Sequence, residues 1–321
     1  MTLDFFELTK GIEFKQFLRY GENPHQEAAW FTFPEEGLSA ASQLQGKELS
    51  YNNLIDLDAA ISTVQEFKEE PAAVVIKHTN PCGVAIAPDI YSALIRALDG
   101  DRVSCFGGII ALNREVNAEC AKELTGAFYE CIVAPSFSNE AKEILAAKKN
   151  LRLLEVDIDN MKLSTYNVRS ILGGVVAQER DNTIVDPSTW ETVTERKPTT
   201  QEVIDLTFAW RVVRHVRSNA ILIAHDGRTL GVGAGQMNRV GSADIALTSK
   251  DNKEILGPTI EGAVLASDGF FPFGDTVRLA NDNGIKAVIQ PGGSIKDQES
   301  IDACNELGMT MILTGTRHFL H

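Results

Sequence analysis

The chain has 321 residues, of which 44% are hydrophobic and 23% are charged, so it can bury one large core or two cores of ordinary domain size. Its formal charge of −14, from 30 Lys and Arg against 44 Asp and Glu, repels polyanions and argues against nucleic acid as a partner. The sequence has no apolar run of about 18 residues and no basic segment before an apolar stretch at its N-terminus, so we expect neither a membrane span nor a signal peptide.

The five cysteines are irregularly spaced and form no C-x-x-C pair. An odd number of cysteines in this arrangement predicts neither a disulfide framework nor a zinc ribbon. A reducing cytoplasm is therefore the expected location. The cysteines are Cys82, Cys105, Cys120, Cys131 and Cys304.

The first distinctive segment is the polar run Arg19–Gln26, with the sequence RYGENPHQ. It packs a guanidinium, a phenol and an imidazole together with turn-forming residues into eight positions. This density of functional groups is typical of a binding loop, although an ordinary surface loop would also fit.

An amphipathic stretch over 56–67 is followed by the β-branched run Ala72–Ile76, and this alternation predicts a layered α/β protein. The segment Lys77–Gly83 (KHTNPCG) comes next, where a chain that leaves a sheet presents its side chains. Lys77 supplies a cation and His78 a group that titrates near neutrality, which suits removal of a proton from an amine while a developing negative charge is stabilised. A single histidine at a strand end is also commonly structural.

His78 begins a near match to the zinc deaminase signature, in which H-x-E is followed by P-C-x-x-C. Asn80 stands where the catalytic Glu would be, and Ala85 stands where the second Cys would be. Cys82 without that partner does not complete a three-ligand zinc site, so we expect no catalytic metal.

A second helix is expected to begin after Pro198, because Thr199-x-x-Glu202 forms a capping box and apolar positions continue to Val213. The polar segment 187–197 precedes this helix. It is the expected boundary between two parts of the chain, residues 1–190 and residues 191–321.

Three later segments are rich in glycine, aromatic or basic residues. The glycines of 231–236 precede Arg239 and would let backbone N–H groups approach a phosphate or carboxylate, although the G-x-G-x-x-G spacing fails. The segment Ser267–Asp275 combines three aromatic residues with two carboxylates, which suits a flat heterocycle. The alternative for that segment is an aromatic core with a helix cap at Asp275. The C-terminal Arg317–His321 is expected to be docked, because it is aromatic and basic.

The two halves of the chain resemble each other at several positions in the same order. The shared order favours two similar α/β units over one continuous sheet with unrelated halves. In this alignment Ala224 and His225 occupy the positions of Lys77 and His78, so the Lys-His pair occurs only once. The matched segments are Ile55–Leu57 with Ile204–Leu206, Ala72–His78 with Asn219–His225, Gly107–Ala111 with Gly262–Ala266, and Cys131–Pro135 with Ala287–Pro291.

Taken together, these segments resemble the transformylase part of the bifunctional AICAR transformylase/IMP cyclohydrolase family of purine biosynthesis enzymes. The resemblance covers residues 18–321 and depends on RYGENPHQ, KHxNPCG, FFPF and RHFxH. It implies two related cytidine-deaminase-like α/β/α units from an internal duplication, and a homodimer whose active sites draw residues from both subunits. We expect the chain to lack the cyclohydrolase domain, so a separate IMP cyclohydrolase would complete the pathway.

By position, the resemblance implies that Lys77 and His78 are the catalytic pair, with His25 as a lesser candidate. The residues that it implies for nucleotide binding are Arg19, Tyr20, Phe106, Gly107, Glu130, Asn219, Arg239, Phe270, Asp275, Arg317 and His321. The residues that it implies for the folate site are Phe106, Pro272 and Phe273.

The expected enzyme is a phosphoribosylaminoimidazolecarboxamide formyltransferase, which moves a formyl group from its cosubstrate 10-formyltetrahydrofolate to the 5-amino group of AICAR and gives FAICAR. His78 would take the proton of the amine and Lys77 would donate to the oxyanion, while Arg19, Arg239 or Arg317 would hold the phosphate. Two alternatives stay open. One is a metal-free deaminase or cyclohydrolase that acts on a related nucleotide, and the other is a nucleotide-binding sensor without turnover.

Overall fold

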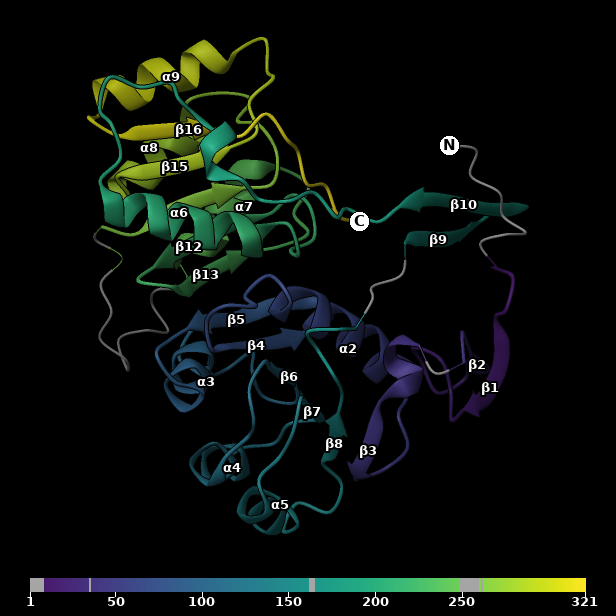
Figure 1. Ribbon diagram of the computed structural model, residues 1–321. Helices are drawn as coiled ribbons and strands as arrows, with labels where there is room; N and C mark the ends of the chain where they lie inside the picture. The colour runs from purple at the N-terminus through teal and green to yellow at the C-terminus, as the bar shows by residue number, and fades with distance from the viewer. Residues whose placement is uncertain (1–8, 35, 162–164, 249–259, 261) are drawn as a thin grey trace.

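The computed structural model describes residues 9–34, 36–161, 165–248, 260 and 262–321. Its largest element is a mixed sheet of twelve strands in the order β11-β16-β15-β14-β12-β13-β5-β4-β6-β7-β8-β3. Two separate hairpins, β1–β2 and β9–β10, lie outside this sheet, and Figure 1 shows them to one side of it. No helix of the described residues is long and apolar enough to cross a membrane.

The first half of the chain contributes β3 to β8 and the helices between them. These elements are β3 (Ser42–Gln45), α2 (Tyr51–Val64), β4 (Ala72–Lys77), β5 (Asn80–Ile86), α3 (Ile90–Leu98), β6 (Ile109–Leu112), α4 (Ala118–Thr125), β7 (Cys131–Ala134), α5 (Asn139–Leu145) and β8 (Arg152–Glu155). The separate hairpins and short 3-10 turns are β1 (Glu13–Leu18), β2 (Ala28–Thr32), η1 (Gly37–Ala40), β9 (Tyr166–Ile171), β10 (Gly174–Glu179) and η2 (Pro187–Thr189).

The second half contributes β11 to β16 and its own helices. These elements are β11 (Glu191–Thr192), α6 (Thr200–Val213), β12 (Ile221–His225), β13 (Arg228–Gly233), α7 (Arg239–Thr248), β14 (Val264–Ser267), α8 (Asp275–Asp282), β15 (Ala287–Gln290), α9 (Asp297–Glu306) and β16 (Thr310–Leu313).

The same order of elements occurs in both halves. A helix, α2 or α6, leads into an antiparallel hairpin, β4–β5 or β12–β13, and three further strands alternate with helices after it. The two hairpins meet side by side, where Arg228 of β13 pairs with Ala85 of β5 in antiparallel register. The halves are therefore parts of one continuous sheet, which confirms the mixed α/β class.

Helices cover both faces of the sheet. On one face, α2 and α6 share a single apolar core, and on the other face α3 to α5 and α7 to α9 pack on their own halves. Strand β4 shows how the sequence allows this, because Ala72, Val74 and Ile76 join the core of α2 and α6 while Ala73 and Val75 join the opposite core. All five side chains are fully buried, so the predicted β-branched strand lies in the centre of the sheet.

The predicted start of α6 is confirmed. The Thr199 hydroxyl accepts the Glu202 N–H at 3.2 Å, and the Glu202 carboxylate accepts the Thr199 N–H at 2.8 Å. The helix then runs from Thr200 to Val213, because the capping box satisfies backbone donors that the first turn would leave without partners.

The hairpin turns correct the sequence alignment of the two halves by one residue. Each turn has two residues with positive φ, His78–Thr79 in the first half and Asp226–Gly227 in the second. The residues that precede the turns, Lys77 and His225, therefore correspond, whereas the alignment paired Lys77 with Ala224. Short apolar strands look alike when shifted by one residue, so their sequences did not fix the register. The Lys-His pair still occurs only once.

A network of ion pairs ties α2, α6, the segment after β10 and the C-terminal tail together. Glu66 lies 3.0 Å from the imidazole of His215 and 3.4 Å from Arg214, and Asp181 lies 3.0 Å from Arg214 and 2.5 Å from His318. Burial alone would raise the pKa of Glu66, but the hydrogen bond and charge of His215 and the charge of Arg214 outweigh it and lower that pKa. The same balance, with His318 and Arg214 as the partners, lowers the pKa of Asp181.

We predict that Glu66→Gln lowers the free energy of unfolding at pH 7 by about 1–3 kcal/mol, because His215 and Arg214 lose a charged acceptor. A carboxylate with a lowered pKa stabilises the fold above its ordinary value of 4.5, and this contribution is lost as the pH falls through the lower pKa of the folded state. Urea unfolding at pH 7 and at about pH 4 should therefore show a smaller difference at the lower pH. Glu69→Gln is the control, because Glu69 is exposed. An equal loss at both pH values would contradict this role of Glu66.

Candidate functional site

Strand directions bring the predicted site residues of both halves to one end of the sheet. β12 runs antiparallel to β13 and β14, β13 to β5, β5 to β4, and β4 to β6, while β7 runs parallel to β6. Strands β4 and β14 therefore finish where β6, β7 and β12 begin, and we call this the site end of the sheet. Lys77, Gly107, Glu130, Asn219 and Phe270 all lie at or just beyond it.

Lys77 is held at the site end by the loop before β6. Its Nζ donates a hydrogen bond to the carbonyl oxygen of Phe106 at 2.8 Å. Gly107 adopts a φ of 69°, and a Cβ at this position would lie 3.2 Å from the Lys77 Nζ, so glycine gives the lysine its space. The ring of Phe106 is 60% exposed and lies 5.5 Å from the ring of Phe128. Lysine, aromatic ring and glycine thus form one cluster.

His78 lies on the exposed turn that follows, and two side chains from other elements hold this turn. Asp56 of α2 accepts the backbone N–H of Thr79 at 2.7 Å. Arg217, which follows α6, donates from Nε to the Thr79 hydroxyl at 2.8 Å and from its backbone N–H to Asn80 at 3.0 Å. The turn of the first half is therefore fixed from both halves of the chain.

Asp56 and Arg217 were missed by the sequence analysis. Asp56 served only as one position of a repeated match, and Arg217 belongs to no motif. Burial raises the pKa of Asp56, although hydrogen bonds from the backbone of Thr79 and His78 and the charges of His78 and Lys77 oppose the rise. Both members of the predicted pair therefore act on the same carboxylate.

Lys77 and His78 do not enter the same enclosed space. Lys77 lines a cavity of about 190 Å³ between the two hairpins, together with Asn80 of β5 and Val232 of β13. His78 lies outside that cavity and is exposed. The pair therefore presents one half-buried cation and one solvent-accessible imidazole.

In the second half, Asn219 is fixed by a buried ion pair. Its side-chain oxygen accepts Arg239 Nη2 at 2.8 Å, and its side-chain nitrogen donates to the Gln236 carbonyl oxygen at 2.8 Å. Arg239 is only 7% exposed, and its Nη1 contacts Ser267 at 2.8 Å and the fully buried Asp268 at 2.5 Å. Asp268 therefore balances the charge of Arg239, and Arg239 in turn orients Asn219.

The C-terminal tail is docked, as predicted. The backbone N–H of His318 donates to the carbonyl oxygen of Asp268 at 3.1 Å. The exposed guanidinium of Arg317 lies 4.3 Å from the ring centroid of Phe319, and the ring of His321 lies 6.0 Å from that of Phe319. Asp268 contacts both the tail, through the His318 N–H, and Arg239, through its carboxylate. The exposed basic groups of the tail are therefore close to Arg239 and Asn219.

Two other predicted regions lie near the site end. Glu130 is the last residue of the loop before β7, and its carboxylate pairs with Arg152 at 2.7 Å. Pro272 is half-buried, and Phe273 is 48% exposed with Lys296 4.6 Å from its ring centroid. Asp275 is exposed and is the first residue of α8, so the helix cap expected there is one residue earlier, at Gly274.

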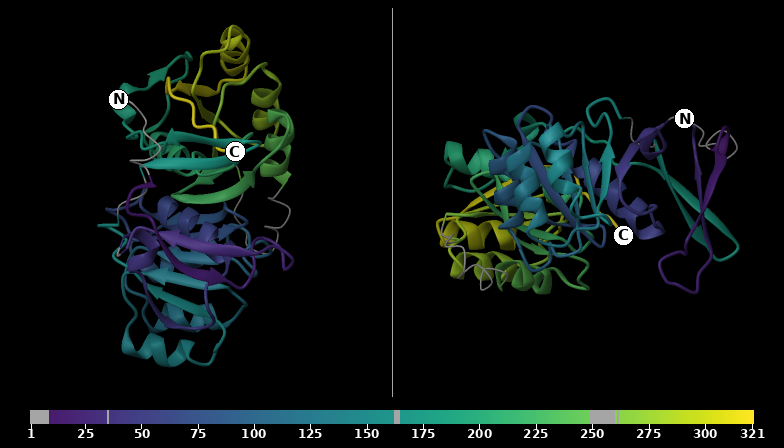
Figure 2. Two further views of the ribbon diagram at one scale, coloured as in Figure 1. Left: turned by 90° about the vertical axis from the view of Figure 1, so that its right-hand side faces the viewer. Right: turned by 90° about the horizontal axis from the view of Figure 1, so that it is seen from below.

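Arg19, Tyr20 and His25 stand apart from these clusters. They follow β1 and lie before β2, on a hairpin that Figures 1 and 2 show standing away from the large sheet. Arg19 donates to the Tyr20 hydroxyl at 2.8 Å, and its guanidinium lies 4.6 Å from the ring centroid of Tyr20. No interaction in the described part of the chain links these three residues to Lys77 or Asn219.

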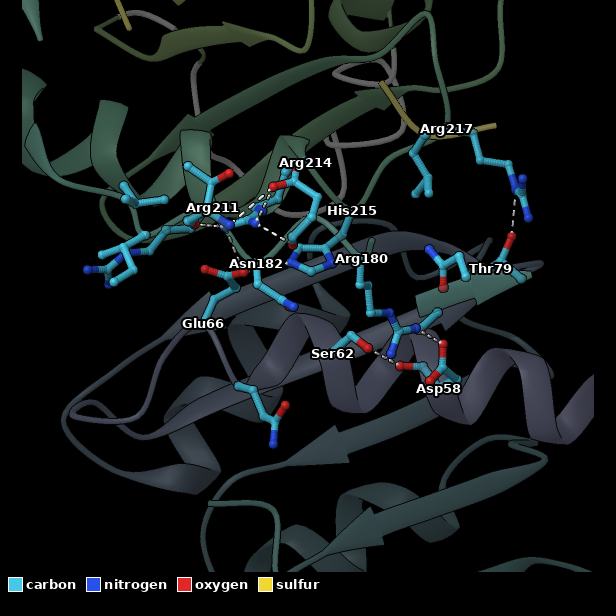
Figure 3. A pocket seen from close by; sticks show the side chains of 18 of the residues that line it. Asp58, Ser62, Glu66, Thr79, Arg180, Asn182, Arg211, Arg214, His215 and Arg217 are labelled. Atoms are coloured by element: carbon cyan, nitrogen blue, oxygen red, sulfur yellow. Dashed lines mark hydrogen bonds and ion pairs between the residues drawn. The ribbon is translucent and has the colours of Figure 1, made fainter. Parts of the chain in front are cut away.

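A cavity of about 930 Å³ lies between α2, the end of α6 and the segment after β10. Figure 3 shows that some of its charged side chains pair with one another, Arg180 with Asp58 and Glu66 with His215. None of the predicted site residues lines it. It approaches the site end where Arg217 meets Thr79 and where Phe319 and Leu320 of the C-terminal tail line it. The candidate chemistry therefore does not coincide with this cavity.

Cys82, the single cysteine of the deaminase-like motif, lies 3.9 Å from Cys105, measured between their sulfur atoms. The contact with Cys105 and burial raise the pKa of Cys82 well above its usual value, which keeps the thiol neutral. Within the described residues, no group of three His, Cys, Asp or Glu side chains is arranged to hold a metal ion.

Comparison with known proteins gives one family match. The family model described as AICARFT/IMPCHase bienzyme matches residues 4–249. Two similar proteins, each called bifunctional purine biosynthesis protein PurH, are 61% identical over 318 residues in Parasynechococcus marenigrum (strain WH8102) and 60% identical over 322 residues in Synechococcus sp. (strain CC9311). Each comparison covers 97% of this chain, which spans 60% of the length of these curated relatives.

Among solved structures, Acinetobacter baumannii RibD, form 2, matches with a TM-score of 0.23 and 14% identity. The match covers 32% of this chain and 34% of that chain, a likeness too small to bear on the fold.

We predict that Arg239→Ala destabilises the fold by about 3–5 kcal/mol, because Asp268 would stay buried without its counter-ion. Arg317→Ala removes an exposed arginine and should change the free energy of unfolding by no more than about 0.5 kcal/mol. Urea denaturation measures both. An Arg239→Ala protein that unfolds at the same urea concentration as the parent would refute the buried pair as a structural element.

Proposed function

The chain belongs to the AICARFT/IMPCHase bienzyme family, and from that premise we propose that it transfers a formyl group from 10-formyltetrahydrofolate to the 5-amino group of AICAR, giving FAICAR. It would be a phosphoribosylaminoimidazolecarboxamide formyltransferase of purine biosynthesis. The observation that carries the proposal is that Lys77 and His78 lie at the same end of the sheet as Asn219. Arg217, which shortly precedes Asn219 in the sequence, donates hydrogen bonds to the turn that carries His78.

His78 is the proposed general base. The amine of AICAR is a weak nucleophile because its lone pair is delocalised into the ring, so its proton must be removed as it attacks. The new C–N bond forms at the formyl carbon, the carbonyl oxygen becomes an oxyanion, and the proton passes to His78. When the intermediate collapses, the bond to N10 of the folate breaks and His78 returns the proton to that nitrogen.

Lys77 is the proposed donor to the oxyanion. Its hydrogen bond to the Phe106 carbonyl oxygen fixes the ammonium before substrate binds, so little reorganisation is needed. Each of the two side chains would contribute about 10²- to 10⁴-fold to the rate. This scheme requires 10-formyltetrahydrofolate as the cosubstrate and no catalytic metal.

Exposed aromatic rings support the proposed substrate positions. Phe106, Phe270 and Phe273 are 60%, 38% and 48% exposed, and such rings can stack on flat heterocycles. Arg317 and Arg19 offer exposed guanidinium groups for the phosphate, which a protein with a charge of −14 needs locally. The proposed nucleotide contacts are Arg19, Tyr20, Phe106, Gly107, Glu130, Asn219, Arg239, Phe270, Asp275, Arg317 and His321, with His25 as a lesser catalytic candidate, and the proposed folate contacts are Phe106, Pro272 and Phe273.

The proposal includes a homodimer whose sites take residues from both subunits. The β1–β2 hairpin, whose loop carries Arg19, Tyr20 and His25, stands away from strand β4 of the same chain (Figure 1). Exposed apolar side chains on the two separate hairpins support such an interface. They are Phe14, Phe17, Phe31, Val168, Ile171, Leu172, Val175 and Val176.

Two cytidine-deaminase-like α/β/α units, residues 1–190 and 191–321, are also part of the proposal, as products of an internal duplication. The repeated order of elements supports this origin. So do Asp56 and Asp205, which occupy matching positions of α2 and α6 and each accept a hydrogen bond from the backbone of a hairpin turn. A cytoplasmic location is consistent with the cysteines, which are all free thiols.

We predict that His78→Ala lowers kcat by about 10²- to 10⁴-fold and changes the KM for AICAR by less than about threefold, because a base acts in the transition state. The measurement is the absorbance change of tetrahydrofolate release with AICAR present. His225→Ala is the matched control, because His225 adjoins the corresponding turn at the other end of the sheet. An unchanged turnover number for His78→Ala would remove His78 from the mechanism.

The same assay separates the alternatives. Conversion of AICAR without the formyl folate would indicate a deaminase or cyclohydrolase. Tight binding of AICAR without turnover would indicate a sensor.

We predict that mixing two inactive variants restores activity if the sites are shared. His78→Ala and Arg19→Ala, unfolded and refolded together, should form mixed dimers in which one of the two sites has both residues intact. Random pairing gives about a quarter of the parent activity, because half of the dimers are mixed and half of their sites are intact. Each variant refolded alone is the control. A mixture no more active than the average of the two would place Arg19 and His78 of one subunit in the same site.

A further inference from the structure

We propose that Asp56 is a positioning residue for the Lys77–His78 pair, which holds the turn of His78 and stabilises the positive charge that forms on the imidazole during proton transfer. This inference rests on the proposed function. It concerns a residue of α2 that no motif of the sequence contains.

The geometry is the first support. His78 and Thr79 both have positive φ, at 51° and 63°, which non-glycine residues rarely adopt without support. Asp56 accepts the Thr79 N–H at 2.7 Å, and Arg217 donates to the Thr79 hydroxyl at 2.8 Å. The turn that carries His78 is therefore held by two hydrogen bonds to Thr79, one accepted by a carboxylate and one donated by a guanidinium.

The charge of Asp56 is the second support. Lys77, and His78 once it is protonated, favour the ionised form of this carboxylate, but burial outweighs them and raises its pKa. An ionised Asp56 therefore costs the fold some stability. A neutral amide could accept the same backbone hydrogen bond, so the turn alone does not require a carboxylate. A negative charge becomes useful when His78 takes a proton, because the imidazolium is then stabilised.

The second half of the chain provides an internal comparison. Asp205 of α6 accepts the backbone N–H of Gly227 in the other hairpin turn at 3.2 Å, and its carboxylate lies 3.5 Å from His225. That turn lies at the opposite end of the sheet from Lys77. Asp205 therefore has the structural role of Asp56 without its proposed effect on the reaction.

The test compares Asp56→Asn with Asp205→Asn in the full chain. Asp56→Asn should lower kcat about 10- to 100-fold, leave the KM for AICAR within about threefold, and leave the urea midpoint of unfolding unchanged or higher. Asp205→Asn should keep kcat within about twofold, even where it lowers the midpoint. An unchanged kcat for Asp56→Asn, or an equal loss in both variants, would overturn the positioning role.

A second pair of variants applies if Asp56→Asn does not fold. Asp56→Glu and Asp56→Gln have the same length and differ in charge, so the Glu variant should be at least about tenfold faster than the Gln variant. Equal rates would overturn the role of the charge. Parent protein that forms no FAICAR would overturn the proposed function itself, whereas an active parent with a fully active Asp56→Asn variant would overturn only this inference.

Discussion

The antiparallel joint between β13 and β5 is the constraint on which the rest of the structure depends. It fuses two halves with the same order of elements into one sheet, and it fixes the direction of the strands of one half relative to those of the other. Strand β4 therefore ends at the site end, where β12 begins. Lys77 and Asn219, which are far apart in the sequence, come to the same end for this reason, while the second hairpin turn at Asp226–Gly227 is carried to the opposite end.

This arrangement gives two similar hairpins different chemical surroundings. The turn of His78 meets Arg217 from the other half and the loop of Phe106 from its own half. The turn after His225 meets neither. A duplicated architecture can thus carry one candidate site, because only the turn of His78 lies at the site end. The turn at Asp226–Gly227 lies at the opposite end, where Arg96 of the first half pairs with Asp226.

Charge is distributed so that an acidic protein can still offer local cations. Arg239 is neutralised by the buried Asp268 and fixes Asn219, so its positive charge is used inside the fold. Arg317 and Arg19 are exposed. Burying an arginine with a carboxylate partner gives rigidity, whereas exposed guanidinium groups stay available to an anionic ligand.

The sequence by itself determined the features that depend on neighbouring residues. The capping box of Thr199 fixed the start of α6, the β-branched run fixed β4 as a buried strand, and the Lys77–His78 motif with its companions indicated the family, because periodicity, capping and motif spacing are local properties. Only the tertiary structure decided that the two halves form one sheet, that Lys77 corresponds to His225, and that Asp56 contacts the turn of His78. These facts depend on strand register and on contacts between distant segments, and short apolar strands or a single aspartate on a helix carry no local signal of either.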